Sequence, residues 1–582
     1  MNLFPLFHAH IVESIRALNL DNLLAADWHQ KVTIELTRDP SHGDLATNVA
    51  MVLAKPLSQS PKELAQRIAV HLLNHSEVIK AEVAGPGFIN LTLSLEFWRA
   101  QLPIILQQGT HYGASALGVG QKVNVEFVST NPTGPMHAGH GRNAVLGDTI
   151  AALLSKVGYD VCREYYVNDA GGQINALARS VYVRYRQACG DTITDADFDA
   201  DMYAADYLMP LAKKIFEQDG SKWLHQPQEA WLDHFRQIST EEMLNLIRQD
   251  LAALGVEMDV FTSEKVLVAN DQVQKTLDLL QAKGDVYQGV LEPPKGHVID
   301  DWEPRPQTLF RATAYGDDVD RPLCKSDGTW TYFAGDVAYH QDKLQRGFHH
   351  LVNIFGADHS GYVKRIQSAV KALTNSQKTV EIKVCQMVNF LENGTPVRMS
   401  KRAGTFITLK DVVERVGKNA TRYMMVSRHQ DMPIDFDFTK VIEHNRDNPI
   451  FYIQYAHARI QSVLRHSREI FPNLSLQNTS LPLHLLIDDH ELAMIKILTN
   501  WPRQVEVAAQ TREPHRVANF LYDVASTFHG LWNKGKDHTH LRFIDPRNSE
   551  QTQARLALIT ATAAVIASGL ELLGITPVQE MK

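Results

Sequence analysis

The sequence has 582 residues, 44% of them hydrophobic and 21% charged, which is the composition of an ordinary globular protein with about three to four domains. Its formal net charge of −8 argues against a surface that binds polyanions indiscriminately, but it does not exclude a local basic groove. The cysteines lie far apart and form no CxxC pair, so we expect neither a disulfide framework nor a metal site built on them. With no signal peptide visible at the start, this cysteine usage is typical of a cytoplasmic protein.

Residues 1–112 have the pattern of an N-terminal α+β domain. A helical repeat over 61–73 is followed by two strand-like segments, "AEVAG" (81–85) and "FINLTLS" (88–94). The dipeptide Pro86-Gly87 joins these segments and predicts a turn.

Residues 113–440 alternate between strand and helix, which predicts a doubly wound, Rossmann-type α/β domain. The strand "KVNVEFVS" (122–129) is followed by a loop rich in glycine and proline and then by a helix with one apolar face. A second strand (162–167) and helix (171–188) follow, and an insertion of about 180–300 is polar and less regular. Sheet signals return in 330–335, 350–356 and 380–400, where Asn393-Gly394 predicts a hairpin.

Residues 441–582 have a helical pattern throughout and predict a separate all-α domain. The most apolar stretch, 556–574, raises the question of a membrane span. Its uncharged part is shorter than the ~20 residues that a span needs. Thr and Ser interrupt it, and Gly574 and Pro577 follow it, so we interpret it as a buried helix and expect no membrane association.

The loop "NPTGPMHAGHGRN" (131–143) stands between the first strand of the Rossmann-type domain and its helix. Such a loop lies at a helix N-terminus, where phosphate groups bind well. His137 and His140 are three residues apart and can donate hydrogen bonds to one ligand, while Gly139 and Gly141 allow its close approach. Two incidental surface histidines or a metal-binding pair are the alternatives, although no third ligand is nearby in the sequence.

A second cluster, "VRMSKRAGTFITL" (397–409), follows the predicted hairpin. Arg398 and Arg402 flank Lys401, and Gly404 comes next, which suits a loop that binds the phosphates of a nucleotide. A basic loop alone is usually a solvated turn, but its combination with the histidine loop is far more specific. The acidic run 195–206 has calcium-loop spacing in part, but Ala200 replaces the required Gly, so we interpret it as a solvated segment.

These two motifs carry a family resemblance. "HAGH" (137–140) resembles the HIGH motif of class I aminoacyl-tRNA synthetases, and "RMSKR" (398–402) resembles their KMSKS motif, with Arg402 in place of the last Ser. Further stretches between residues 42 and 460 resemble the arginyl-tRNA synthetase family in particular: "HGDLATNVAM", "GPGFIN", "VEFVSTNPTGPMHAGHGR", "YYVNDAGGQI", "IFGADHSGYVKR" and "NPIFYIQYAHARI". The sequence is identified as a member of that family over nearly its full length.

The resemblance implies that arginine attacks the α-phosphate of ATP, and that the arginyl group then passes from the adenylate to the terminal ribose of tRNA(Arg). ATP with Mg²⁺ is the implied substrate, without a tightly bound cofactor or a dedicated metal site. His137, His140 and Lys401 are the implied catalytic residues. The implied ATP-binding residues are Pro132, Gly139, His140, Gly141, Asn143, His359, Met399, Ser400 and Lys401.

Arginine carries a planar, always charged guanidinium, which requires carboxylates in its pocket. Glu126 in the first strand and Asp336 are the leading candidates, and an acid inside an apolar strand is costly unless it is paired. The alternative is that Glu126 faces solvent or pairs with a structural arginine. By resemblance, the arginine-binding residues are Glu126, Ser129, Asn131, His137, Tyr332, Asp336 and Asp358.

The resemblance assigns tRNA binding to the flanking domains of a monomer. The N-terminal domain would contact the tRNA elbow, and the helical domain would contact the anticodon through Tyr452, Gln454, Tyr455 and Arg459, with Trp532 as a further aromatic. For the aromatics, a place in the helical core is the alternative. Rival functions are a synthetase for another amino acid, a non-catalytic tRNA-binding protein, and a nucleotidyltransferase that makes adenylates without tRNA. The presence of His140, Lys401 and two acids suited to a cation favours arginine charging.

Overall fold

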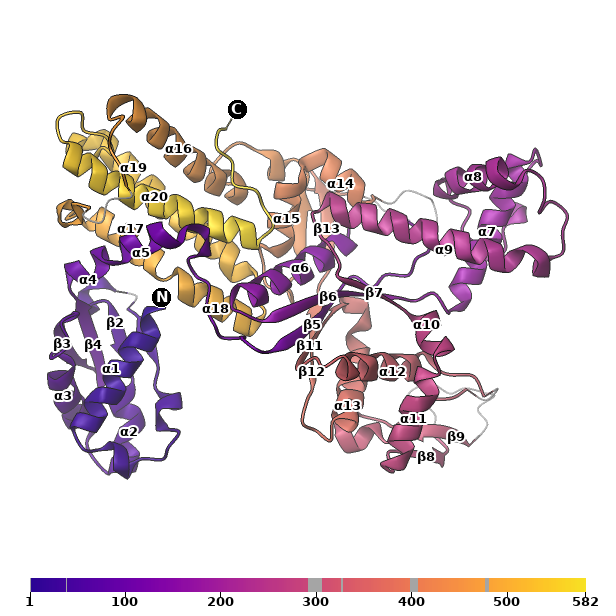
Figure 1. Cartoon of the computed structure of the whole chain (residues 1–582), viewed down its shortest axis with the longest axis horizontal. Coiled ribbons are helices and arrows are strands. Elements are labelled where there is room, and N and C mark those ends of the chain that lie inside the picture. The colour runs from indigo at the N-terminus through magenta and orange to yellow at the C-terminus, as the bar shows by residue number, and fades with distance from the viewer. Residues whose placement is uncertain are drawn as a thin grey trace.

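A computed structural model describes residues 2–37, 39–291, 306–325, 328–397, 407–476 and 481–581 of the chain. Figure 1 shows the N-terminal domain at one end, a helical bundle beside it, a central sheet, and two peripheral units at the opposite end. In the N-terminal domain, α1 (Leu3–Ala17), α2 (Val49–Leu57) and α3 (Pro61–Leu72) accompany an antiparallel sheet of order β1-β2-β4-β3. Its strands are Ile34–Leu36, Leu45–Thr47, Phe88–Leu93 and Val78–Ala84 in that order. The predicted helix and the two strands joined at Pro86-Gly87 are confirmed.

The central sheet has five parallel strands in the order β12-β11-β5-β6-β7. They are Val380–Cys385, His350–Gly356, Lys122–Glu126, Asp160–Val167 and Val260–Ser263. Of these five strands β5 comes first along the chain and lies in the middle of the sheet, and the strand order reverses between β5 and β11. This is the doubly wound arrangement, in which ligands bind beyond the carboxyl ends of the strands at the reversal. The helix α6 (His140–Lys156) follows β5 as predicted.

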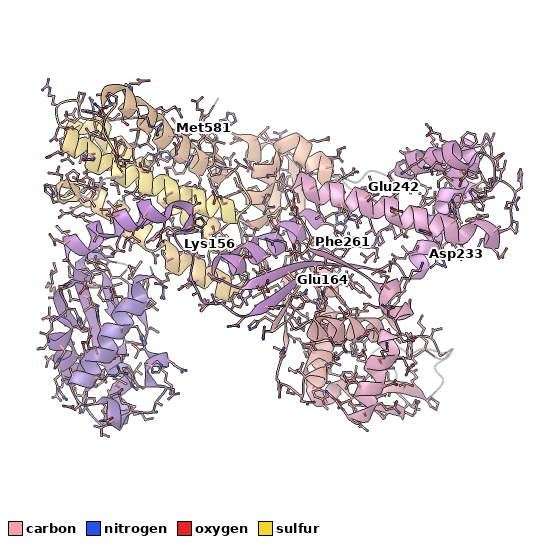
Figure 2. The ribbon with its side chains drawn as sticks, viewed as in Figure 1. Lys156, Glu164, Asp233, Glu242, Phe261 and Met581 are labelled. Atoms are coloured by element: carbon pink, nitrogen blue, oxygen red, sulfur yellow. The ribbon has the colours of Figure 1, made fainter. Side chains whose placement is uncertain are left out.

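Residues 172–253 form a helical unit that extends away from the sheet (Figure 1). Its helices are α7 (Gly172–Ala188), α8 (Met209–Asp219) and the long α9 (Gln228–Ala253), and Figure 2 shows Asp233 and Glu242 along α9. The acidic segment that precedes α8 is exposed to solvent, as interpreted, and Arg179 of α7 forms ion pairs with Asp199 and Asp201, whose side chains are 65% and 61% exposed. The predicted insertion is therefore more regular than its composition indicates, and β7 returns it to the central sheet.

A second peripheral unit contains α10 (Glu264–Ala269), α11 (Gln272–Ala282), α12 (Tyr332–Gln345), α13 (Val363–Leu373) and a sheet of order β10-β9-β8. The strands of that sheet are Arg321–Pro322, Gln307–Phe310 and Val286–Gly289. The prediction of a strand at 330–335 is wrong, because α12 begins there. The hydroxyl of Thr331 accepts a hydrogen bond from the Ala334 backbone N–H and caps the helix. Aromatic and β-branched residues resemble a strand locally, but here they form a helix N-terminus.

The predicted hairpin at Asn393-Gly394 is confirmed, between β13 (Val388–Glu392) and β14 (Thr395–Pro396). The remaining strand, β15 (Ile434–Asp437), pairs with β13. Two short helices, α4 (Leu95–Arg99) and α5 (Gln101–Gln108), connect the N-terminal domain to the rest of the chain, and α14 (Leu409–Val416) and α15 (Lys418–Val426) precede β15. The domain boundaries at 112 and 440 stay predictions.

The C-terminal part is helical, as predicted, with α16 (Pro449–Ile470), α17 (Asp489–Thr499), α18 (Trp501–Thr511), α19 (His515–Asp537) and α20 (Ser549–Leu572). By length and composition alone, α20 is long and apolar enough to cross a membrane, so the sequence argument from length is wrong. Its most apolar window is nevertheless 83% buried inside the protein. The interpretation of this stretch as a buried helix is confirmed.

One buried arginine connects the central domain to both neighbouring helical units. Arg422 on α15 donates hydrogen bonds to the carbonyl oxygens of Leu573 (2.5 Å) and Leu254 (3.0 Å), at the ends of α20 and α9. It also forms an ion pair of 2.6 Å with Asp148 on α6. Since its side chain is fully buried, removing it takes the donor from two carbonyl groups and one of two arginine partners from Asp148, which keeps Arg163 at 3.1 Å.

We therefore expect Arg422→Ala to destabilise the protein by about 3 kcal/mol or more, which a thermal melt would record as a Tm several degrees lower. Arg446→Ala is the matched control, because the Arg446 side chain is exposed and lies 3.9 Å from Asp447. An Arg422→Ala protein that melts with the control would contradict this role.

Candidate active site

A cavity of about 250 Å³ lies beyond the carboxyl ends of β5 and β11, where the strand order reverses. Glu126 at the end of β5, Glu264 at the start of α10 and Asp336 on α12 place three carboxyl groups in its wall. The other polar lining residues are Ser129, Tyr166, Asn168, Tyr332, Tyr339, His340, Asn353, His359 and Tyr362. A small cavity with this many acids is suited to a cationic ligand.

Glu126 already has a cationic partner in the protein. The ammonium group of Lys343 donates to Glu126 Oε2 at 2.6 Å, and both side chains are buried. Ser129 Oγ donates to the other carboxylate oxygen at 3.2 Å. The alternative considered from the sequence, an internal partner for Glu126, is therefore what the structure shows, with a lysine in place of an arginine.

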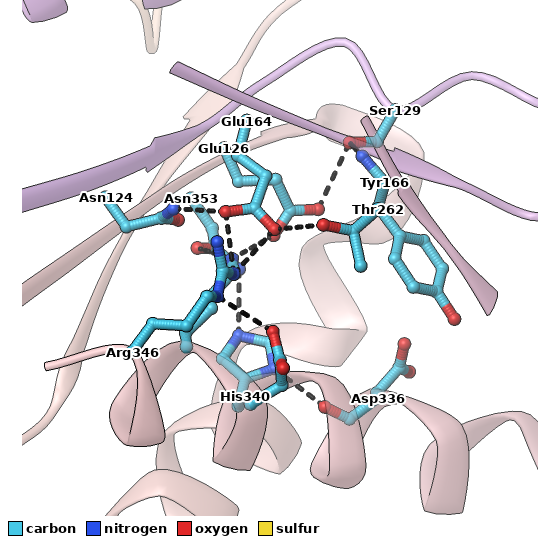
Figure 3. Close-up of polar contacts among 12 residues, drawn as sticks. Asn124, Glu126, Ser129, Glu164, Tyr166, Thr262, Asp336, His340, Arg346 and Asn353 are labelled. Atoms are coloured by element: carbon cyan, nitrogen blue, oxygen red, sulfur yellow. Dashed lines mark hydrogen bonds and ion pairs between the residues drawn. The ribbon is translucent and has the colours of Figure 1, made fainter. Parts of the chain in front are cut away.

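A second ion pair, between Arg346 and the buried Glu164, lies near Glu126 (Figure 3). Arg346, three residues after Lys343 on α12, donates to both oxygens of Glu164 at 2.8 Å. The same carboxylate accepts hydrogen bonds from Asn124 (2.5 Å) and Thr262 (2.6 Å). Burial acts to raise the pKa of Glu164, but Lys343, Thr262 and Arg346 outweigh it and lower that pKa. These contacts join α12 to three neighbouring strands of the sheet.

Asp336 has no such partner. Among the described residues, its carboxylate makes no hydrogen bond or ion pair, and it faces the cavity. Burial, followed by the charges of Glu126 and Glu264, raises the pKa of Asp336 to about 8, with Lys343 acting in the opposite direction. This carboxyl group is therefore mostly protonated at neutral pH.

Glu264 is the second acid of the cavity that lacks a cation. Its Oε2 atom is buried and has no hydrogen-bond partner among the described residues. Burial, and then the charge of Asp169, raises the pKa of Glu264. A buried carboxylate oxygen without a partner is costly, so a ligand with N–H donors would be stabilised here.

The imidazole of His340 is neutral and is hydrogen-bonded to the first turns of α12 and to β11. The Asn353 side chain donates to its Nε2 at 3.0 Å, so Nδ1 carries the proton and donates to the Asp336 carbonyl oxygen at 2.8 Å. Burial, and then Lys343, lowers the pKa of His340 to about 3. Its hydrogen bonds therefore stay the same across the physiological pH range.

The histidine loop lies at the N-terminus of α6, as predicted. The rings of His137 and His140 stack with their centroids 3.7 Å apart, and the Gly139 backbone N–H donates to His137 Nδ1 at 3.0 Å. A Cβ atom on Gly139 would lie 2.8 Å from His137 Cε1, and one on Gly141 would lie 2.7 Å from Leu409 Cδ1. These glycines thus make room for protein side chains, where the sequence analysis expected them to make room for a ligand.

The backbone of this loop is bonded to the segment that follows the basic motif. The Ala138 N–H donates to the Ile407 carbonyl oxygen at 2.9 Å, and the Leu409 N–H donates to the Met136 carbonyl oxygen at 2.8 Å. The buried carboxylate of Asp250 on α9 accepts from the Met136 N–H at 2.8 Å. The histidine loop is therefore bonded to the described segment that begins at Ile407, about 270 residues further along the chain.

Asn143 holds the same loop at its other end. Its side chain accepts from the Val128 N–H at 2.7 Å and donates to the Ile354 carbonyl oxygen at 3.0 Å. Val128 and Ser129 have positive φ values of 69° and 41°, which are costly for such residues. Asn143 thus stabilises a strained turn between β5 and β11, so its side-chain amide is engaged by protein and the predicted contact with ATP gains no support from the geometry.

The structure brings together some of the predicted site residues and separates others. Glu126, Ser129, Tyr332 and Asp336 line the cavity with His359. Asn131, Pro132, His137 and Asp358 do not line it, and the Asp358 side chain is 79% exposed. Met399, Ser400 and Lys401, with the flanking arginines, lie outside the described residues.

The sequence analysis did not identify Glu264 and Tyr166, which line the cavity, or Lys343, which pairs with Glu126. Glu264 lies in the segment interpreted as an insertion, and Lys343 contacts Glu126 across 217 positions of the chain. Tyr166 is the second residue of the quoted stretch "YYVNDAGGQI", which was the one signal available for it.

The helical domain places three predicted RNA contacts on one face and buries the fourth. Arg459 lies over the rings of Tyr455 (4.1 Å) and Trp532 (4.5 Å), and Tyr452 packs 4.4 Å from His529. Gln454, in contrast, is buried, and its amide donates to Thr576 and accepts from Val578. The structure thus gives no support to a contact between Gln454 and RNA, because its side chain holds the C-terminal segment.

Three family models match the chain in order: the arginyl tRNA synthetase N-terminal domain over 7–93, the catalytic domain of tRNA synthetases class I (R) over 101–462, and the DALR anticodon binding domain over 453–581. The chain belongs to the arginyl-tRNA synthetase family. It is 52% identical to the arginine–tRNA ligases of Rhodospirillum rubrum and Azorhizobium caulinodans, over the full length of each chain.

Solved structures have the same fold. The arginyl-tRNA synthetase of Thermus thermophilus has a TM-score of 0.73 at 20% identity, with both chains fully covered. A putative arginyl-tRNA synthetase from Campylobacter jejuni has a TM-score of 0.71 at 28% identity and covers 84% of this chain and 100% of its own. The predicted family, fold class and enzyme class are confirmed: this arginyl-tRNA synthetase family member is a ligase that charges tRNA with arginine and uses ATP.

We expect Gly139→Ala to lower ATP–pyrophosphate exchange by about 100-fold, because the new methyl group displaces the His137 ring by contact with Cε1. Gly172→Ala is the matched control, since a Cβ there meets nothing within 4 Å. Exchange in Gly139→Ala that equals the control would show that the position of His137 is unimportant.

Proposed function

We propose that the cavity between β5 and β11 binds L-arginine, with its guanidinium group between Asp336 and Glu264. The observation that carries this proposal is that these two acids have no cationic partner among the described residues, whereas Lys343 already neutralises Glu126. A guanidinium offers planar N–H donors to two carboxylates at once. The ammonium group of lysine has fewer directed donors and leaves acceptors unpaired, so it is discriminated against.

The arginine backbone then extends toward the histidine loop. Ser129 stands beside Glu126 after the end of β5, where its hydroxyl oxygen can accept a hydrogen bond from the α-ammonium group. Tyr332 is 60% exposed at the start of α12, where it can close over the side chain of a bound ligand. In this orientation the α-carboxylate points out of the cavity, toward the N-terminus of α6.

We assign the triphosphate of ATP to the N-terminus of α6. The helix end favours anions, and the rings of His137 and His140 stack there, where imidazole N–H groups can donate hydrogen bonds to phosphate oxygens as charge develops. Lys401 lies outside the described residues, and its assignment to the phosphates rests on the resemblance. The assignment of Pro132, Met399, Ser400 and His359 to ATP rests on the resemblance alone.

The chemistry needs positioning and charge stabilisation rather than a covalent enzyme intermediate. A carboxylate oxygen of arginine attacks the α-phosphorus, and pyrophosphate leaves with the charge held by the histidines and Lys401. The 2′-hydroxyl of the tRNA then attacks the arginyl carbonyl, and AMP leaves. Mg²⁺ would bind through the ATP phosphates, because the only grouping of three potential metal ligands among the described residues lies in the N-terminal domain.

We assign the anticodon to the face formed by Tyr452, Tyr455, Arg459 and Trp532. The tyrosines and the tryptophan can stack on unpaired bases, and Arg459 supplies a cation that is already ordered between two rings. The elbow of the tRNA is assigned to the N-terminal domain by resemblance. We further propose that the enzyme is a cytoplasmic monomer. Its four free cysteines support the cytoplasmic location, because the cytoplasm keeps thiols reduced.

We expect Asp336→Asn to lower kcat/KM for arginine in pyrophosphate exchange by about 100-fold or more, because the amide cannot pair with a buried guanidinium. Asp342→Asn is the matched control: it lies on the same helix, pairs with Arg346 at 2.9 Å, and does not line the cavity. Normal arginine use by Asp336→Asn would refute the proposed pocket, and full activity with lysine would refute its selectivity.

The binding of arginine should also release a proton at neutral pH. The carboxyl group of Asp336 has a pKa of about 8 in the empty cavity, and a bound guanidinium favours its ionised form. Affinity therefore increases as the pH rises toward 8 and levels off above it. Calorimetry at pH 7 in buffers of different ionisation enthalpy should record proton release that is absent at pH 9 and in Asp336→Asn. An affinity that does not change between pH 6.5 and pH 9 would contradict this.

A further inference from the structure

The N-terminal domain holds a cluster of two histidines and two glutamates, far from the cavity. His10 and Glu13 lie one turn apart on α1, and His75 and Glu77 lie on the turn before β3. The potential ligand atoms of His10, Glu13 and His75 all lie within 4.8 Å of one another. Glu77 Oε2 lies 3.9 Å from His10 Nε2, which is too long for a hydrogen bond.

His10 Nε2 is the atom of this cluster that needs an explanation. It is buried and has no hydrogen-bond partner among the described residues. Such an atom in a native protein indicates an ion or a water molecule at the site.

We propose that His10, Glu13, His75 and Glu77 form a binding site for one divalent transition-metal ion of the zinc class. Neutral imidazole nitrogens and carboxylate oxygens are common ligands of such ions, in sets of four. The two carboxylates balance the charge of the ion. Soft thiolate ligands are absent from the cluster, so a monovalent copper site is not expected.

Metal binding requires one ring to turn. The rings of His10 and His75 are stacked, with centroids 3.8 Å apart and planes at 24°, whereas a metal ion lies in the plane of each imidazole that binds it. His10 is held on α1, but His75 lies on a turn, so its ring is the one that can rotate about its side-chain bonds. The bound ion would join α1 to the turn before β3 and so stabilise the N-terminal domain against unfolding.

The test is titration of the tag-free, full-length protein with Co²⁺, a spectroscopic substitute for Zn²⁺. We expect one equivalent to bind and to give the visible absorption bands of a four- or five-coordinate ion, which Zn²⁺ then displaces. Saturation should raise the Tm of the first unfolding step by a few degrees. Arginylation activity should be the same with and without the metal, because none of the ligands belongs to the active site.

His75→Ala should lose both the absorption bands and the Tm shift. The Tm of this variant without metal shows whether it is folded. His8→Ala is the matched control, because His8 lies on the same helix and its Nε2 contacts the His29 carbonyl oxygen at 3.0 Å. The proposal is overturned if the wild-type protein binds no Co²⁺, if His75→Ala binds as the wild type does, or if His8→Ala loses the ion.

Discussion

The buried ion pair between Lys343 and Glu126 determines what the active site can recognise. It joins α12 to the end of β5, directly at the reversal of strand order, and Arg346 and Glu164 repeat the arrangement three residues further along α12 (Figure 3). Buried charges of this kind are tolerated only with their partners present, so α12 has one stable position on the sheet. Because Lys343 neutralises Glu126, the remaining acids of the cavity, Asp336 and Glu264, are the ones left for a ligand.

This arrangement separates support from recognition. The residues that hold the pocket in place are neutralised inside the protein and keep their hydrogen bonds over the physiological pH range, as His340 does. The acids that face the ligand, Asp336 and Glu264, have no cationic partner among the described residues. The site therefore favours a ligand cation with several N–H donors. In the loop before α6, too, the residues that hold the backbone differ from those assigned to the ligand. Asp250 accepts a hydrogen bond from the backbone of this loop, and Asn143 accepts one from the turn that precedes it, so protein side chains fix the position of the two histidines.

The sequence was informative where local patterns decide the structure. The strand β5, the loop and α6 were predicted because a β-branched run, glycines and an amphipathic repeat follow one another within 35 residues. The segment 330–335 was misread because its aromatic residues suit a strand equally well, and only the cap at Thr331 distinguishes a helix start. Lys343 and Glu264 were missed for a different reason: their roles depend on partners far away in the sequence. The assignment of Gln454 to tRNA stays a prediction that the geometry does not support, since its buried amide is bonded to the C-terminal segment, a contact that no local pattern indicates.

The measurement that tests the account most directly is the affinity of the enzyme for arginine compared with citrulline, the neutral analogue of nearly the same shape. If the unpaired acids Asp336 and Glu264 recognise the guanidinium charge, citrulline should bind about 100-fold more weakly or worse at pH 8. Citrulline that binds within about threefold of arginine would contradict the account, because shape rather than charge would then decide selection.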